Sequence, residues 1–296
     1  MNTLKTIDVT LRDGGNRINF HFNDETLHHI LPLLDKSGIE YIEIGYRNGA
    51  ICPMDGIGKA GLCPKDFLLD CRSLIKNSNI AVMAHPQNLS PEDIQELKAC
   101  GVDLLRICVS RGQADKALPV IQESKNEGLE VSVNFIHASQ YSEQDLDKAV
   151  KTVSESQPDM IYFADSNGSL LPETVEKLYK RYVGQFAVSF GFHAHDNLGL
   201  AQANTIAAIR AGAKYIDYSL AGMGKGIGNL RTEFFAAYLR AIKARNYDLD
   251  AILKAANYMR KAFNAAGELV QMDEFTRGIY DLSTAEIKLD YAKNLG

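Results

Sequence analysis

The chain has no tryptophan, only five cysteines among its 296 residues, and no long hydrophobic run. An odd number of cysteines without a C-x-x-C pair disfavours both a disulfide framework and a cysteine zinc site, so we expect reduced thiols in a cytoplasmic protein. No apolar run approaches the roughly 20 residues that span a bilayer, and the start MNTLKTIDVTLRDGG lacks the apolar core of a signal peptide. We therefore expect no membrane association.

Positive charge is not in excess either. The chain has 32 Lys and Arg against 37 Asp and Glu, a net charge of −5, which gives no electrostatic basis for nucleic-acid binding. With 46% hydrophobic residues, the composition is that of a globular protein with a core large enough to fold without metal or disulfide staples.

Short apolar runs rich in β-branched and aromatic residues alternate with segments of helical spacing, about 30 residues apart. Helix starts are marked by Asn23, Ser90 and Ser142, and helix ends by glycines such as Gly101 and Gly128. We expect eight strands, within Lys5–Asp13, Tyr41–Arg47, Asn79–His85, Leu104–Ser110, Glu130–His137, Met160–Ser166, Ala187–His195 and Tyr215–Ala221.

Eight alternating units of this size predict an α/β fold, a closed parallel (β/α)8 TIM barrel over residues 1–245. An open doubly wound sheet is the alternative, disfavoured because no G-x-G-x-x-G follows the first strand. Residues 246–296 are expected to form a short helical C-terminal extension that packs on the barrel.

Chemistry in such barrels lies at the carboxyl ends of the strands. His193 and His195 are two residues apart on the seventh predicted strand and so point to the same side. Asp13 ends the first strand, which contributes to the same interior layer, so the three side chains predict a divalent metal site. A hydrogen-bonded core histidine pair and a non-haem iron oxygenase remain as alternatives at this point. Nitrogen and oxygen ligands together suit Mn²⁺, Zn²⁺, Fe²⁺ or Co²⁺.

Two further features adjoin this site. Arg12 either acts on substrate or forms a salt bridge with Glu43 from the neighbouring strand, and both roles are compatible. The glycine-rich loop from Gly222 to Asn229 precedes a helix, whose N-terminus favours an anion such as a carboxylate.

The motifs TLRDGG, IEIG, ADSNG and GFHAHDNLGLAQANTIAAIRAGAKYIDYSLAGMGKGIGNLRTE resemble the DRE-TIM metallolyase superfamily, and within it the 4-hydroxy-2-oxovalerate aldolase group. The resemblance covers about residues 5–245. It implies a divalent metal, Mn²⁺ or Mg²⁺ in most members, held by Asp13, His193 and His195. The eighth-strand loop AGMGKGIGN is short and cysteine-free, unlike those of Claisen-type synthases and hydroxymethylglutaryl-CoA lyase.

One departure from the aldolase pattern concerns the base. The aldolases have a histidine three residues after the metal aspartate, and this chain has Asn16, which is not a useful proton acceptor. His21 and Tyr280 are the candidate replacements, Tyr280 because GIYDLSTAEI weakly resembles the aldolases' C-terminal tyrosine segment.

The resemblance thus implies a metal-dependent aldolase that cleaves or forms a carbon–carbon bond of a 4-hydroxy-2-oxoacid, with a pyruvate-like enolate and an aldehyde as the two halves. Arg12, His21, Glu43 and Tyr280 are the expected catalytic group, and Asn16, Ser166, Gly222 and Asn229 the expected substrate-binding group. The alternatives are a Claisen-type or HMG-CoA lyase-like enzyme and a non-catalytic metal-binding barrel. A homo-oligomer and a docked aldehyde dehydrogenase subunit are both compatible with the sequence.

Overall fold

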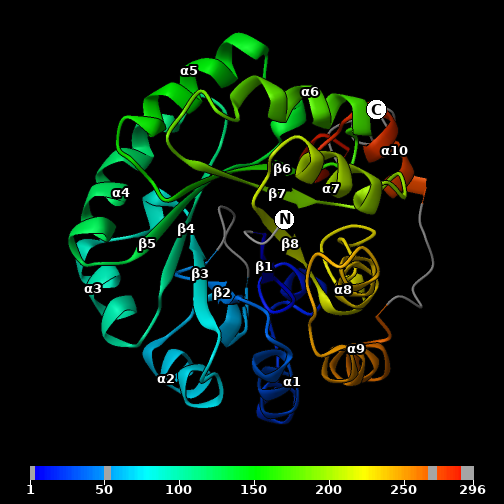
Figure 1. Ribbon diagram of the computed structural model, residues 1–296. Helices are drawn as coiled ribbons and strands as arrows, with labels where there is room; N and C mark the ends of the chain where they lie inside the picture. Colours follow the sequence, from blue (N-terminus) through cyan, green and yellow to red (C-terminus); the bar gives the residue numbers. More distant parts are fainter. Residues whose placement is uncertain (1–3, 50–54, 266–271, 288–296) are drawn as a thin grey trace, which may run out of the picture.

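The computed structural model describes residues 4–49, 55–265 and 272–287. Eight parallel strands form a closed barrel in the order of the sequence, with helices around it (Figure 1). The strands are β1 (Lys5–Asp8), β2 (Tyr41–Tyr46), β3 (Asn79–Ala84), β4 (Leu104–Val109), β5 (Glu130–Phe135), β6 (Met160–Asp165), β7 (Ser189–Ala194) and β8 (Tyr215–Tyr218). The helices are α1 (Asp24–Ser37), α2 (Lys65–Leu74), α3 (Pro91–Ala99), α4 (Ala117–Asn126), α5 (Glu143–Ser154), α6 (Pro172–Tyr182), α7 (Ala201–Arg210), α8 (Thr232–Ala241), α9 (Leu249–Phe263) and α10 (Met272–Tyr280).

The predicted barrel is thereby confirmed, and β1 closes it against β8 in parallel register, from Lys5 beside Tyr215 to Asp8 beside Tyr218. The expected helix starts are also observed, since Asn23, Ser90 and Ser142 each cap a helix with their side chains. The first strand is shorter than predicted. It ends at Asp8, because the chain turns from Thr10 onward and the Asp13 amide donates back to the Val9 carbonyl at 2.8 Å.

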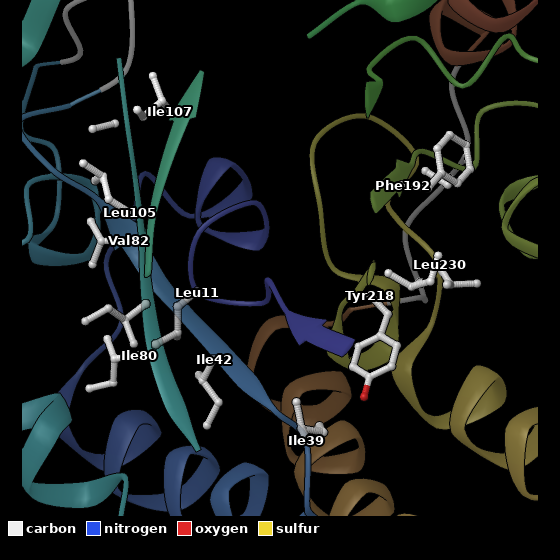
Figure 2. Close-up of a cluster of buried hydrophobic side chains, with 14 of the residues drawn as sticks. Leu11, Ile39, Ile42, Ile80, Val82, Leu105, Ile107, Phe192, Tyr218 and Leu230 are labelled. Carbon is white, nitrogen blue, oxygen red and sulfur yellow. The ribbon is translucent and has the colours of Figure 1, made fainter. Parts of the chain in front are cut away.

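Two apolar layers position the site. Outward-facing residues of the strands pack against the helices, among them Ile80 and Val82 of β3 and Leu105 and Ile107 of β4 (Figure 2). Inward-facing residues fill the amino-terminal half of the barrel and form a separate apolar cluster: Ile7, Val9, Tyr41, Ala81, Leu104, Met160 and Tyr162. This cluster closes one end of the barrel, so polar inward-facing side chains gather at the other end.

The C-terminal segment follows the barrel helices. Helix α9 packs against α1 and α8 (Figure 1), and Gly278 of α10 lies against Asn197 and Leu198 in the loop between β7 and α7. Residues 266–271 and 288–296 of the predicted extension lie outside the described residues. Within the described part of the chain, no helix has the length and apolar character that crossing a membrane requires.

Candidate metal centre and active site

A cavity of about 420 Å³ opens at the carboxyl ends of the strands. Its walls come from the strand ends and from the C-terminal residues Ser283, Thr284 and Ala285. The predicted metal ligands Asp13, His193 and His195 all line it. The extension therefore helps to build the site, beyond packing on the outside of the barrel.

The three predicted ligands converge. Their donor atoms all lie within 4.8 Å of one another, and each residue is at most 6% exposed. Nε2 of His193 lies 3.3 Å from Nε2 of His195, which lies 3.8 Å from Oδ2 of Asp13. The turn that begins at Thr10 brings Asp13 to the two imidazoles.

The groups that lie beside Nδ1 of each histidine determine which ring nitrogen is available to a metal. Nδ1 of His195 lies 3.2 Å from the carbonyl of Lys225, and Nδ1 of His193 lies 3.0 Å from Oδ2 of Asp217. Because the carbonyl of Lys225 only accepts hydrogen bonds, Nδ1 of His195 carries the proton and its Nε2 keeps a lone pair. The Asp217 carboxylate favours a proton at Nδ1 of His193 as well, so Nε2 of this ring is the atom left to bind a cation. Two lone pairs and a carboxylate that face one another repel unless a cation lies between them. The residues present therefore fit a divalent metal.

Electrostatics hold these groups in their metal-binding forms. Burial opposes ionisation of Asp13, but the Arg12 guanidinium and then His195 hold the pKa of this carboxyl well below its usual range. Burial lowers the pKa of His195 to about 3, so its imidazole is neutral at physiological pH. Asn229 donates from Nδ2 to Oδ2 of Asp13 at 2.7 Å and orients the carboxylate.

A buried layer of charge lies beneath the metal centre. Arg12 donates from Nε to Oε2 of Glu43 and from Nη1 to Oδ1 of Asp13, both at 2.7 Å. Arg106 bridges the same Glu43, at 3.0 Å, and Asp217, at 2.8 Å. Both expected roles of Arg12 are thus compatible with its placement, because it pairs with Glu43 and also lines the cavity.

The predicted substrate-binding residues fall into two pairs. Asn16 and Ser166 line the cavity. Gly222 and Asn229 are absent from its lining: the carbonyl of Gly222 accepts the Asn229 amide at 2.9 Å, and the Asn229 side chain holds Asp13. In this placement their polar groups stabilise the loop and the Asp13 ligand, and a substrate contact of either residue stays a prediction.

The two predicted bases lie away from the cavity. His21 is exposed, and its Nε2 pairs with the carbonyl of Gly56 at 2.6 Å. Tyr280 is 68% exposed at the end of α10. The turn after β1 carries His21 outward, and the C-terminal segment presents residues 283–285 to the cavity, so neither expected base reaches the strand ends.

Sequence reasoning gave no role to several residues that line the cavity. His85 follows β3, stacks on Tyr46 with ring centroids 5.9 Å apart, and has its pKa lowered to about 4 by burial and by Arg12. His137 follows β5, two strands further along the barrel, and its amide donates to Ser166. Their places at strand ends were visible in the sequence, but which side chains face the cavity depends on the strand register.

The comparisons with known proteins agree with this geometry. A model of the HMGL-like family matches residues 3–259. The chain is 32% identical to an oxaloacetate decarboxylase of Mycobacterium tuberculosis, over 84% of this chain and 74% of that protein. It is 30% identical to a 4-hydroxy-2-oxovalerate aldolase of Geobacillus genomosp. 3, over 93% of this chain and 82% of that protein.

Solved structures add two neighbours. The N-terminal domain of a putative aldolase from Bacteroides vulgatus superposes with a TM-score of 0.85 at 29% identity, covering 98% of this chain and 96% of that one. An HMG-CoA lyase of Bacillus subtilis, at 17% identity, TM-score 0.75, and 93% and 98% coverage, shares the fold. Aldolases and decarboxylases break carbon–carbon bonds, and this chain is accordingly a carbon–carbon lyase. It belongs to the HMGL-like family, the divalent-metal-dependent DRE-TIM metallolyases.

Proposed function

We propose that the enzyme cleaves, or in reverse forms, the C3–C4 bond of a 4-hydroxy-2-oxoacid, with pyruvate and an aldehyde as the other side of the reaction. The observation that carries the proposal is the convergence of Asp13, His193 and His195 beside Arg12 in one cavity. The relatives named 4-hydroxy-2-oxovalerate aldolase support this substrate class.

Asp13, His193 and His195 would hold the divalent metal, for which we propose Mn²⁺ or Mg²⁺, with Zn²⁺ and Co²⁺ as alternatives. A divalent cation bound there supplies a Lewis acid that stabilises negative charge on a keto oxygen. Arg12 adds a fixed guanidinium to the same end of the cavity. Because Glu43 and Asp13 restrain it, the guanidinium does not have to reorganise when charge develops on the substrate.

The cavity also has groups for the substrate carboxylate. Ser166 accepts the His137 amide at its Oγ, at 2.9 Å, which leaves the hydroxyl proton for another partner. Asn16 and Lys225 line the same cavity. We assign Ser166 and Asn16 to the carboxylate end of the substrate, with the positive charge of Lys225 nearby.

A second candidate is the decarboxylation of oxaloacetate, which yields the same pyruvate enolate. The observation that favours it is Asn16 in place of the aldolases' histidine, because loss of CO₂ requires no base for a substrate hydroxyl. The relative named oxaloacetate decarboxylase supports this alternative. A Claisen-type reaction has weaker support, since the solved HMG-CoA lyase is similar in fold alone. A homo-oligomer and an aldehyde dehydrogenase partner stay predictions.

The test is a substrate screen with metal control. We expect 4-hydroxy-2-oxopentanoate to release pyruvate and acetaldehyde, EDTA to abolish the reaction, and Mn²⁺ or Mg²⁺ to restore it. Oxaloacetate, with CO₂ release as the readout, tests the second candidate, and thiol release from acyl-CoA tests the Claisen alternative. Full cleavage activity in the Asp13→Ala and His195→Ala variants would overturn the metal site.

A further inference from the structure

Asp281, the residue after α10, holds the C-terminal segment over the active site by hydrogen bonds. Oδ1 of Asp281 accepts three hydrogen bonds, from Ser139 Oγ at 2.6 Å, Asn167 Nδ2 at 2.7 Å and Ser169 Oγ at 2.7 Å. These donors come from the loops after β5 and β6. The segment held in this way continues directly into residues 283–285, which line the cavity.

This contact fixes the orientation of a buried amide. A carboxylate only accepts hydrogen bonds, so the Asn167 atom beside Asp281 must be the NH₂ group. The amide oxygen of Asn167 therefore faces the other way, toward Nδ1 of His137 at 3.1 Å. Asn167 is fully buried and has little freedom to turn.

The orientation of Asn167 in turn fixes the tautomer of His137. An amide oxygen cannot donate, so Nδ1 of His137 carries the proton. Burial lowers the pKa of His137, so the ring is neutral and its Nε2 keeps a lone pair. None of the described residues hydrogen-bonds this Nε2, and His137 lines the active-site cavity as well as a neighbouring cavity beside Gln140 and Glu286.

We propose that His137 is the general base for the substrate hydroxyl, and that Asn167 and Asp281 are positioning residues that hold it in the proton-accepting tautomer. The inference rests on the proposed aldol cleavage and supplies the base that Asn16 cannot provide. It also gives the C-terminal segment a function, because the base is prepared only when Asp281 occupies its place.

The 4-hydroxyl proton moves to Nε2 of His137 while the C3–C4 bond breaks, and the oxygen left behind forms the aldehyde carbonyl. The electron pair of the broken bond forms the C2–C3 double bond of the enolate. The imidazolium then returns its proton to C3, which yields pyruvate and the neutral ring. His85 is the weaker candidate, because its ring stacks on Tyr46 and the nearby Arg12 guanidinium adds to burial in lowering its pKa to about 4.

The experiment compares two reactions of the Mg²⁺-loaded enzyme. His137→Gln should lower kcat for cleavage of 4-hydroxy-2-oxopentanoate by about 10²–10⁴-fold, the range of a lost general base. CO₂ release from oxaloacetate needs no such base and should stay within about threefold of the wild-type rate. An unchanged cleavage rate, or an equal loss in both reactions, overturns the proposal. A wild-type enzyme that decarboxylates oxaloacetate but cleaves no 4-hydroxy-2-oxoacid instead overturns the proposed aldolase function.

The positioning role has its own variants. Asn167→Leu removes the acceptor of Nδ1 while Ser139 and Ser169 still hold Asp281, so cleavage should fall at least tenfold without a matching loss of decarboxylation. Asp281→Asn, whose amide oxygen can take the same three donors, should retain most of the activity that Asp281→Ala loses. Asn126→Leu, at the exposed end of α4, is the matched control for the Asn-to-Leu change and should keep the wild-type rate.

Nitrogen NMR of ¹⁵N-histidine-labelled protein tests the tautomer independently of activity. The wild type should show His137 protonated at Nδ1, with its signals assigned by their absence from His137→Gln. The Asn167→Leu spectrum should show a loss of this preference. Protonation of the wild-type ring at Nε2 would overturn the assignment, whichever substrate the enzyme uses.

Discussion

Nδ1 of His193 lies 3.0 Å from Oδ2 of Asp217, a carboxylate on β8 that is almost completely buried. Partners of this kind fix the orientation of a metal-ligating imidazole and raise its basicity. Asp217→Asn should therefore weaken metal binding by about 10–100-fold, measured by titration calorimetry with Mn²⁺. Asp165→Asn is the control, because this buried carboxylate accepts the amides of Ser169 and Leu170 and should leave the affinity unchanged. Equal affinities in the wild type and Asp217→Asn would contradict the positioning role.

The ion-pair layer beneath the metal centre should dominate local stability. Arg106 is 1% exposed and bridges Glu43 and Asp217, so Arg106→Met takes one of the two guanidinium groups from these buried carboxylates. Glu43 then keeps Arg12, and Asp217 keeps His193 and the more distant Arg12. We expect the free energy of unfolding in urea to fall by about 3–5 kcal/mol. Arg181→Met removes a more exposed pair with Asp147, which water and salt screen, and should lower the free energy of unfolding much less. Similar decreases in the free energy of unfolding in the two variants would show that the buried ion pairs stabilise the fold no more than the exposed pair.

These two predictions also show what the sequence could and could not reveal. The barrel followed from eight apolar runs with capped helices between them, and the pairing of His193 with His195 followed from their two-residue spacing at the end of β7. Asp13 reaches them by the turn after β1, which strand spacing does not describe. Arg106 left a signal as well, a charge between Leu104 and Cys108 on the inward face of a buried strand. Its partners could not be read from that signal, because they depend on the register of strands far apart in the chain.

The predicted bases lie outside the cavity for a different reason. His21 lies in the turn after β1, whose course is set by packing and by Gly56, far along the chain. Tyr280 was placed by a weak motif match, whereas Asp281 beside it makes the contacts that hold the segment. The local sequence pattern could place functional residues at the strand ends. It could not determine the path by which the C-terminal segment reaches those strand ends.

Arg12 should matter equally for cleavage and for decarboxylation, since both produce an enolate. Arg12→Ala should lose at least about 2.7 kcal/mol of transition-state stabilisation, roughly a hundredfold in kcat, on the scale of an oxyanion-hole donor. Metal content of the purified variant must be measured in parallel, because Arg12 also contacts Asp13 at 2.7 Å. A near-normal rate in a fully metal-loaded variant would remove Arg12 from the mechanism.

Stability should depend on pH through Asp8, at the end of β1. Burial raises the pKa of this carboxyl from 3.8 to about 7, although Thr10 and Thr232 donate to it and Glu233 lies nearby. A group whose pKa is raised on folding stabilises the fold at low pH and loses that contribution as pH rises through the folded-state value. Between pH 5 and pH 8 the wild type should therefore lose about 2–3 kcal/mol relative to Asp8→Asn. If the free energies of unfolding in urea of the two proteins change equally between pH 5 and pH 8, the raised pKa of Asp8 is contradicted.

The assignment of His137 as base predicts that the lost function can be supplied from another position. Asn16 lines the same cavity and occupies the place where the aldolases that this chain resembles have their base. Because Asn16 donates to the carbonyl of Asp13 at 3.0 Å, an imidazole at position 16 would lie close to the metal centre.

In a His137→Gln background, Asn16→His should raise kcat for cleavage of 4-hydroxy-2-oxopentanoate at least tenfold and leave oxaloacetate decarboxylation unchanged. Asn16→Gln in the same background is the control for size and polarity and should give no recovery. If both double variants recover equally, or if Asn16→His accelerates decarboxylation as well, the gain comes from packing or metal affinity and not from a restored proton acceptor.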